Sequence, residues 1–286
     1  MTTYLGIYRE PMCSPGRHLT NDAAILELVA ASLRANGHSV ALATLDDAES
    51  IRHEASLIFS MCQSPDGLRT IAAWELAGAT VVNNSAASLS TYREALIPKL
   101  RRHGLAVPAT SFVRTSATAR ADARSVLDDS GRWIKRGDLH ASVPDDVRWV
   151  ETGEALEQTL DDFERRGIAI AAVQAHAPGR ELKFYAIRGS DFFHCQAADG
   201  VPAAANDEAT ARALAADVAT ALDLEIFGGD IVVGPDHVPT LIDVNDWPSF
   251  APCRERAAAA IGEYLETRLD PDRIRAFPAS ANAPTV

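Results

Sequence analysis

The first third of the chain alternates short apolar runs, rich in β-branched residues, with longer segments of helical periodicity. The short runs predict strands at residues 4–8, 39–44, 56–60 and 80–83. The longer segments predict helices at 21–36 and 68–77, each followed directly by a glycine, as is common at helix ends. This β-α-β order predicts a small parallel sheet covered by helices, and such sheets bind ligands beyond the carboxyl ends of their strands. The loop after the first strand, with Arg9 and Arg17, is therefore a candidate ligand loop.

The rest of the chain has the pattern of α+β lobes. Residues 85–103 are predicted to be helical, and Pro108 marks a crossing into a middle lobe. The helices predicted beyond it are 118–129, 154–166, 207–223 and 253–269. The strands predicted beyond it are 132–136, 148–151, 168–176, 182–188, 226–233 and 238–244. The chain is therefore divided into an N-terminal α/β lobe (1–84), connecting helices with a central lobe (85–190), a C-terminal lobe (191–276) and a Pro/Ala-rich tail (277–286) predicted to be disordered.

Composition excludes several classes of protein. The chain of 286 residues carries a formal net charge of -12, which argues against a general binder of nucleic acid or anionic membranes. No apolar run reaches the roughly 20 residues of a membrane helix, and the first residues lack the pattern of a signal peptide. The four cysteines show no zinc-site spacing, so a reduced, cytoplasmic protein is expected.

Lysine is rare in this chain. Of the 27 basic residues only three are lysine, namely Lys99, Lys135 and Lys183. Codon bias explains a low total but not the positions at which lysine is kept. The compact ammonium of lysine and the wide, planar guanidinium of arginine are not interchangeable at a crowded phosphate, so these positions are candidates for a phosphate site.

The segment GGDIVVGPDHVPTLIDVNDWPSF predicts a hairpin, because two β-rich runs flank a turn made of Gly, Pro and Asp. Strand alternation places Asp243 and Asn245 on one face, and Asp230 on the partner strand can reach the same face. Two carboxylates and an amide oxygen suit Mg²⁺. A solvated hairpin face is the alternative, but the apolar neighbours of these residues favour burial, and buried carboxylates need partners.

With these residues in view, the chain resembles the ATP-grasp enzymes. The hairpin, its Asp-x-Asn and the proline turn into a helix resemble the C-terminal signature of that family. Earlier segments resemble the family in the same order. The helix and the crossing that lead into the central lobe correspond to NNSAASLSTYREALIPKLRRHGLAVPATSFV, and a strand with a phosphate-facing lysine corresponds to RWIKRGD. The hinge and the strand after it correspond to AAVQAHAPGRELKFYAI. The resemblance covers about residues 81–269. It implies an ATP-grasp fold, of the α/β and α+β classes, with an N-terminal parallel α/β lobe.

The resemblance also implies that ATP and Mg²⁺ bind between the lobes. The phosphates would be contacted by Lys135, Lys183 and either Lys99 or Arg93, since the family spacing allows both. The metal would be held by Asp230, Asp243 and Asn245. The adenine would be hydrogen-bonded by the backbone of the hinge residues Gln174, Ala175, His176 and Ala177.

The chain departs from the family pattern at two places. Aspartate stands at Asp243, where glutamate is the commonest metal ligand. The loop after Lys135 lacks a glycine-rich run and offers His140 and Ser142 instead. His140 is a candidate for contact with the γ-phosphate or the acceptor, and an exposed loop histidine is the alternative reading.

Most ATP-grasp enzymes are ligases that activate a carboxylate as an acyl phosphate, which an amine or thiol then attacks. In that reading Arg180, together with Lys183 and His140, belongs to the catalytic residues. The carboxylate would be held by Arg180, by Arg9 or Arg17, or by backbone N–H groups after Pro248, at Ser249. Partners would be a small carboxylate and an amine, without nucleic acid or membrane, and the family suggests a homodimer.

Two alternatives stay open. The DVNDWPSF segment, the KFYAI strand and a histidine in the loop after Lys135 also resemble inositol polyphosphate kinases, which transfer phosphate to a hydroxyl. The acidic balance of the chain opposes the strongly basic acceptor pocket that those kinases need. A non-catalytic nucleotide-binding protein is the third possibility.

Overall fold

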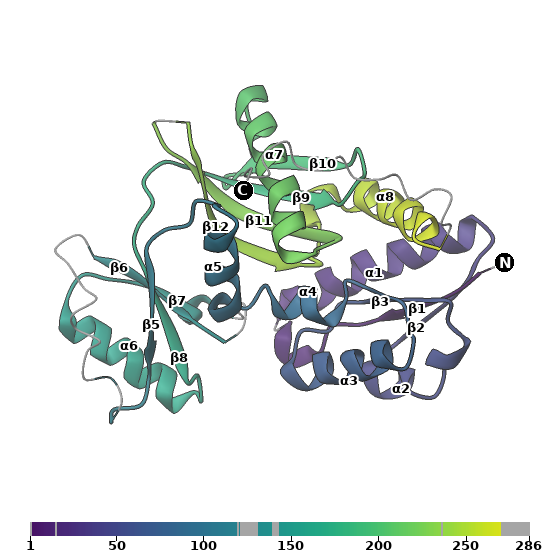
Figure 1. Cartoon of the computed structure of the whole chain (residues 1–286), viewed down its shortest axis with the longest axis horizontal. Coiled ribbons are helices and arrows are strands. Elements are labelled where there is room, and N and C mark those ends of the chain that lie inside the picture. Colours follow the sequence, from purple (N-terminus) through teal and green to yellow (C-terminus); the bar gives the residue numbers. More distant parts are fainter. Residues whose placement is uncertain are drawn as a thin grey trace, which may run out of the picture.

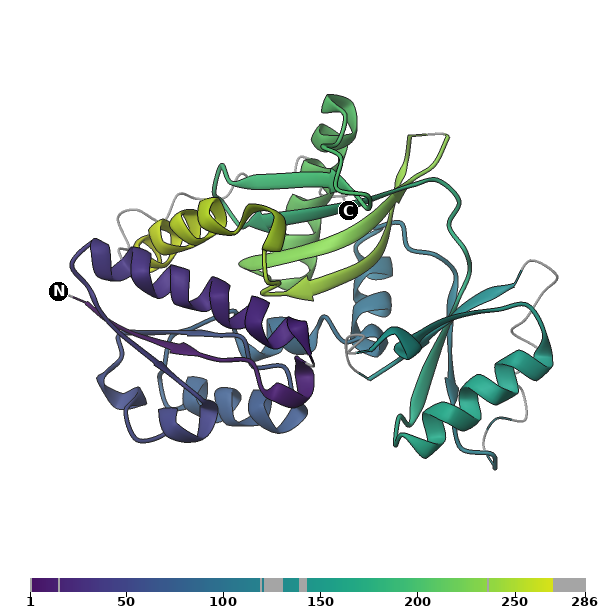
Figure 2. The same ribbon diagram turned by 180° about the vertical axis from the view of Figure 1, so that it is seen from behind.

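The described part of the chain forms three lobes, each built on a four-stranded sheet (Figure 1). The computed structural model describes residues 2–14, 16–118, 120, 131–138, 143–235 and 237–269. The C-terminal lobe lies between the N-terminal lobe and the central lobe, as the view from behind also shows (Figure 2). Among the helices of the described residues, none combines the length and the apolar character needed to cross a membrane.

The N-terminal lobe contains the predicted parallel sheet, in the order β2-β1-β3-β4. Its strands are β1 (Thr3–Ile7), β2 (Ser39–Ala43), β3 (Leu57–Ser60) and β4 (Val81–Val82). Its helices are α1 (Arg17–Ala35), α2 (Leu45–Ala48) and α3 (Pro65–Leu76), with short 3-10 turns at Pro11–Cys13 and Arg52–Glu54. Strand alternation sends Tyr4 and Phe59 towards α1, and Leu5 and Ile58 to the opposite face towards α3.

The central lobe is an antiparallel sheet, in the order β5-β8-β6-β7, with one helix on one face. Its elements are β5 (Thr110–Arg114), β6 (Arg132–Arg136), β7 (Val147–Val150), α6 (Gly153–Arg165) and β8 (Ile170–Gln174), with a 3-10 turn at Pro144–Asp146. Ile134 and Val173 pack against Leu160 and Phe163 of α6. The opposite face of this sheet carries Lys135.

The C-terminal lobe is an antiparallel sheet, in the order β10-β9-β11-β12, covered on one face by α7. Its elements are β9 (Arg180–Ile187), β10 (Phe193–Ala197), α7 (Ala205–Leu222), β11 (Ile226–Val233), β12 (Pro239–Asp246), a 3-10 turn at Ala251–Cys253 and α8 (Arg254–Thr267). Helix α8 packs against α1, and Trp247, Phe250 and Ile261 join the core that contains Tyr4 and Phe59. The N-terminal and C-terminal lobes therefore share one hydrophobic core.

The predicted central unit (85–190) differs from the structure at both of its ends. Strand β9 pairs with β10 and β11, so it belongs to the C-terminal sheet and not to the central lobe. The predicted helix 85–103 is two helices, α4 (Ser85–Leu89) and α5 (Arg93–Arg102), because the chain is extended at Tyr92. Ala87 of α4 and Leu96 and Leu100 of α5 pack in the core of the C-terminal lobe. The connecting helices therefore belong with the C-terminal lobe.

Some predicted elements cannot be compared with the structure. All of the predicted helix 118–129 except residues 118 and 120, and the whole tail 277–286, lie outside the described residues. Strand β10 was not predicted, although its residues alternate as in a strand with one buried face. Phe193, Cys195 and Ala197 are buried, whereas His194 and Gln196 lie on the face away from α7.

Asn83 joins the N-terminal lobe to β11 through its buried side chain. Its Oδ1 accepts hydrogen bonds from the backbone N–H groups of Glu225 (2.8 Å) and Ile226 (2.9 Å), and its Nδ2 donates to the carbonyl of Ile226 (2.7 Å). Asn83→Ala removes the acceptor of the backbone N–H groups of Glu225 and Ile226, so we expect the free energy of unfolding to fall by about 3 kcal/mol. Urea unfolding measures this loss. Asn36→Ala, which removes an exposed contact with Glu266, is the control and is expected to change it little.

Candidate functional site

A row of charged side chains crosses the face of the C-terminal sheet that lies opposite α7. Asp230 on β11 stands directly opposite Lys183 on β9 and opposite Asp243 on β12. Lys183 Nζ lies 2.6 Å from Asp230 Oδ1. Asn245 stands opposite Gly228 and faces the same side. The structure therefore brings together Asp230, Asp243 and Asn245 on one face, as the hairpin pattern predicted.

Lys135 approaches this row from the central lobe. It follows Ile134, which points into the core beneath α6, so alternation turns Lys135 to the opposite face. The side chain is buried, and this burial lowers the pKa of Lys135 to about 8. Asp243 and Asp230 oppose this shift through their negative charges, whereas the Arg93 guanidinium adds to it. Groups from two lobes thus act electrostatically on one amine.

The helix cation in the cluster is Arg93 and not Lys99. Arg93 begins α5, its side chain is 5% exposed, and its Nη2 lies 2.5 Å from Asp243 Oδ2. Its Nη1 donates to the carbonyl of Arg136 at 3.0 Å, which ties β6 of the central lobe to β12. Lys99 comes six residues later, on a different side of the helix, because successive residues are about 100° apart. The structure therefore places Arg93, and not Lys99, in the charged cluster, and its contact with the phosphates stays a prediction.

The charges in the row are strongly coupled. Burial raises the pKa of Asp230 against the opposing effect of Lys183. Burial also disfavours the charge on Lys183, but Asp230 outweighs it and raises the pKa of Lys183 above its ordinary value. The ion pair with Lys183 thus offsets only part of the cost of burying the Asp230 carboxylate. The same ion pair is sufficient to keep Lys183 charged.

This donor set fits a magnesium ion. Among the residues that the structure describes, no group of three or more His, Cys, Asp or Glu side chains is placed to hold a metal by itself. Asp230 and Asp243 offer carboxylate oxygens and Asn245 an amide oxygen, which are hard ligands that Mg²⁺ accepts together with substrate phosphates. A divalent cation would also supply the compensation that the partly buried Asp230 lacks. The role of these three residues as metal ligands stays a prediction.

The hinge between β8 and β9 lies beside an aromatic cluster. The Trp133, Trp149 and His176 rings lie with centroids 5.2–6.5 Å apart, and Trp133 Nε1 donates to His176 Nδ1 at 3.3 Å. Trp133 shares its face of β6 with Lys135, two residues away. This cluster was not predicted from the sequence. The signal for it is that Trp133 lies two residues before Lys135, which places both side chains on the same face of the strand.

The hinge residues themselves are partly engaged within the protein. Gln174 is buried, and its Nε2 donates to Thr110 Oγ1 at 3.3 Å. The backbone N–H of Ala175 donates to the carbonyl of Ala109 at 2.8 Å, so it is not available to a base. The hydrogen bonds from the backbone of His176 and Ala177 to adenine stay a prediction.

Arg180 is not part of the cluster. It lies three residues before Lys183 on the same strand, so the two side chains point to opposite faces of the sheet. Arg180 Nη1 pairs with Asp207 of α7 at 3.1 Å. The predicted catalytic and carboxylate-binding roles of Arg180 are therefore corrected, since the sheet separates it from the charged row.

The other predicted substrate residues have mixed outcomes. Arg9 donates from Nε to the carbonyl of Met61 (3.2 Å), donates from Nη2 to the carbonyl of Trp247 (2.7 Å) and pairs with Asp22 (3.3 Å). This engagement gives Arg9 a role in joining the loop after β1 to the loop after β12. Ser249 lies in that second loop, half-buried, ahead of α8. Arg17 begins α1, but its side chain is not among the described parts of the structure. His140 lies wholly outside the described residues.

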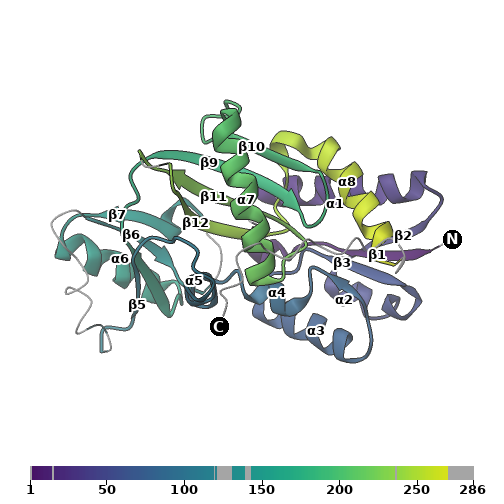
Figure 3. The same ribbon diagram turned by 45° about the horizontal axis from the view of Figure 1, so that its top comes forward.

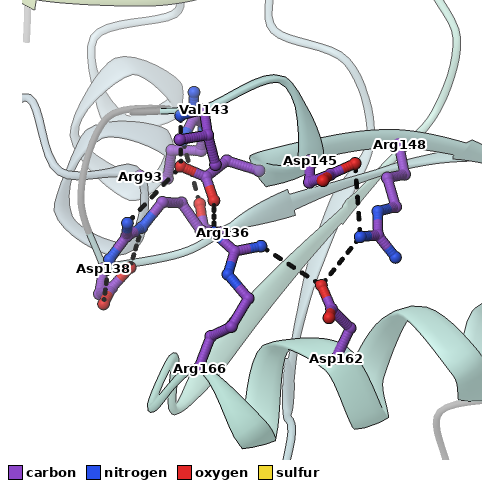
Figure 4. Close-up of polar contacts among 9 residues, drawn as sticks. Arg93, Arg136, Asp138, Val143, Asp145, Arg148, Asp162 and Arg166 are labelled. Atoms are coloured by element: carbon purple, nitrogen blue, oxygen red, sulfur yellow. Dashed lines mark hydrogen bonds and ion pairs between the residues drawn. The ribbon is translucent and has the colours of Figure 1, made fainter. Parts of the chain in front are cut away.

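A polar network supports the central-lobe side of the site (Figure 4). Arg136, at the end of β6, donates from Nε to Asp138 at 2.8 Å and lies 3.6 Å from fully buried Asp146. Asp146 also accepts from Arg166, which follows α6, and from the backbone N–H of Val143. These contacts fix both described ends of the segment between β6 and β7, next to Arg93.

The fold is that of ATP-grasp proteins. An ATP-grasp protein of the RimK-domain type from Sphaerobacter thermophilus superimposes with a TM-score of 0.72 at 17% identity, over 92% of this chain and 99% of that one. A D-alanine–D-alanine ligase from Bacillus anthracis, complexed with ATP, gives 0.74 at 12% identity, over 97% and 100%. The VanG D-Ala:D-Ser ligase from Enterococcus faecalis gives 0.73 at 13% identity, over 94% and 99%. No protein-family model matches the sequence, and no curated protein matches it.

Proposed function

We propose that the protein is an ATP-dependent ligase that activates a small carboxylate as an acyl phosphate and joins it to an amine. The observation that carries this proposal is the cluster of Lys135, Arg93, Lys183, Asp230 and Asp243, built from two lobes. Transfer of a γ-phosphoryl group depends mostly on positioning and on neutralising charge, which such a cluster supplies. Two of the similar structures are named as ligases of D-alanine, and one of these is complexed with ATP.

The roles of the residues follow from their charges. Lys135, Arg93 and Lys183 would neutralise the phosphate oxygens, and Asp230, Asp243 and Asn245 would hold Mg²⁺. The bound metal would neutralise negative charge on the β- and γ-phosphates. The Trp133 ring and the hinge backbone at His176 and Ala177 would contact the adenine. The backbone at Ser249, ahead of α8, would hold the substrate carboxylate. The binding partners of the protein would be its small-molecule substrates.

Product analysis tests the proposal against the kinase alternative. Purified protein with ATP, Mg²⁺ and pooled amino acids is expected to release ADP and inorganic phosphate in equal amounts, and only when a carboxylate substrate is present. ADP without phosphate, together with a phosphorylated sugar or inositol, would establish the kinase. AMP and pyrophosphate would contradict both.

The lowered pKa of Lys135 predicts that nucleotide binding takes up a proton. The free protein holds this amine near a pKa of about 8, whereas a bound polyphosphate favours its charged form and raises that pKa. Around and above this pH, binding therefore consumes a proton, and the affinity for ATP falls as the pH rises. Calorimetric titration in two buffers with different enthalpies of ionisation measures the uptake. The Lys135→Met variant should bind ATP more weakly and should not take up this proton on binding. Unchanged proton uptake in that variant would show that a group other than Lys135 takes up the proton.

A further inference from the structure

The charged row continues beyond Lys183 to the edge of the C-terminal sheet. Gln196 on β10 stands directly opposite Lys183, so the order across the four strands is Gln196, Lys183, Asp230 and Asp243. Strand β10 is the edge of this sheet (Figure 3). Two strand spacings separate Gln196 from Asp230, a distance of about 10 Å. The row thus extends from the proposed metal end of the site to β10, where Gln196 forms a single bridge with Pro202 on its outer side.

A second row lies beside the first, displaced by two residues along each strand. It consists of His194, Tyr185, Gly228 and Asn245. A methyl group on Gly228 would lie 3.0 Å from Cγ of Pro248, so the loop after β12 packs directly on the sheet there. Phe250 of the same loop lies 5.5 Å from the Tyr185 ring, centroid to centroid. The loop therefore covers the middle of the second row, and His194 lies half-buried at its open end.

His194 is oriented by its neighbour on the strand. Its Nε2 lies 3.0 Å from Gln196 Oε1. An amide oxygen only accepts hydrogen bonds, so Nε2 carries the proton of the neutral imidazole and Nδ1 carries the lone pair. The Tyr185 ring, on the neighbouring strand, lies with its centroid 6.0 Å from that of the His194 imidazole. Gln196 thus fixes Nδ1 as the basic nitrogen of His194, which lies beside the end of the charged row that runs from Asp243 to Gln196.

We propose that His194 is the general base that deprotonates the attacking amine, and that Gln196 is its positioning residue. This inference rests on the proposed ligase function. In the amide-forming step the acceptor ammonium gives one proton to His194 Nδ1, and its nitrogen attacks the acyl carbon. The new C–N bond replaces the C–O bond to phosphate, the second N–H proton leaves with the phosphate, and His194 then releases its proton to water.

The test compares two nucleophiles. Hydroxylamine attacks an acyl phosphate in its neutral form and needs no base, whereas an amino acid enters with a charged ammonium. His194→Gln keeps an N–H donor for Gln196 and removes the basic nitrogen. With ATP, Mg²⁺ and pooled amino acids, this variant is expected to form amide product about 10²–10⁴-fold more slowly. Its rate of hydroxamate formation with added hydroxylamine should stay close to that of the unaltered protein.

The controls separate this role from a general loss of structure. Hydroxamate formation by His194→Gln itself reports an intact activating site. Gln196→Leu, which removes the acceptor for Nε2, should slow amide formation less strongly and also spare the hydroxamate rate. His103→Asn, at the end of α5, where His103 Nδ1 contacts the Lys99 carbonyl, should change neither rate.

The possible outcomes are distinct. Equal loss of both rates in His194→Gln, or loss of neither, would overturn the assignment of His194 while leaving the ligase intact. Absence of both hydroxamate and ADP from the unaltered protein would overturn the ligase proposal, and the role of His194 with it.

Discussion

Asp243→Asn is expected to lower kcat/KM by about 10²–10³-fold, because it removes a charge from the centre of the site. Asp243 pairs with Arg93 at 2.5 Å, stands opposite Asp230 and contributes to the field around Lys135. Asparagine keeps the shape but leaves Arg93 and Lys135 without this negative partner and weakens the proposed metal site. Mg²⁺-dependent ATP binding should weaken together with the rate. Steady-state kinetics and calorimetric titration at several Mg²⁺ concentrations measure the two effects.

A matched control lies on the other side of the same sheet. Asp207 pairs with Arg180 at 3.1 Å on the α7 face, so Asp207→Asn also breaks one ion pair of the C-terminal lobe. Its activity and its ATP affinity should remain close to those of the unaltered protein. Full activity of Asp243→Asn would show that the hairpin does not form the metal and phosphate site.

Lys135→Arg should also lose about 10²–10³-fold in kcat/KM, although it preserves the positive charge. The Lys135 side chain is buried between the sheets, where a compact ammonium fits and the wider guanidinium displaces its neighbours. An arginine also cannot lose its proton, so it remains charged beside Arg93 in the nucleotide-free protein. The circular dichroism spectrum and the unfolding midpoint should be measured first, to show that the variant is folded.

Lys99→Arg is the control for this substitution. Lys99 lies on a different side of α5 from Arg93, outside the charged cluster, so exchange for arginine should leave activity nearly unchanged. Retention of full activity by Lys135→Arg would remove the argument that lysine is required at this position. The rarity of lysine in the chain would then reflect codon usage alone.

Residues within a single strand were predictable from the sequence. A β-bulge beside Asp230 shifts the register of the hairpin and sets Asp243 opposite Asp230, which the turn and alternation alone do not predict. Asp243 and Asn245 share a face because side chains alternate along a strand. The same rule places Lys135 opposite the apolar side of β6. It also applies to Arg180 and Lys183, whose spacing of three residues separates them on a strand, and neglect of that spacing produced the wrong assignment of Arg180.

Contacts between lobes were less predictable. Whether Arg93 or Lys99 reaches the cluster depends on where the helix begins, and the extended backbone at Tyr92 makes Arg93 the first residue of α5. The ion pair of Arg93 with Asp243 joins positions 150 residues apart, a distance at which no periodicity in the sequence carries information. The edge position of β10, and with it the place of His194, follows from the pairing of the other side of β9 with β11, which comes after α7 in the chain.

The central claim is that a carboxylate is activated by transfer of the γ-phosphoryl group to one of its oxygens. Amino acids labelled with ¹⁸O in their carboxylates, incubated with the protein, ATP and Mg²⁺, test it directly. The account predicts that the inorganic phosphate released carries one ¹⁸O atom from the carboxylate, as ³¹P NMR or mass spectrometry of the phosphate will show. Phosphate released without label, or ADP formed with the phosphoryl group on a hydroxyl, would contradict it.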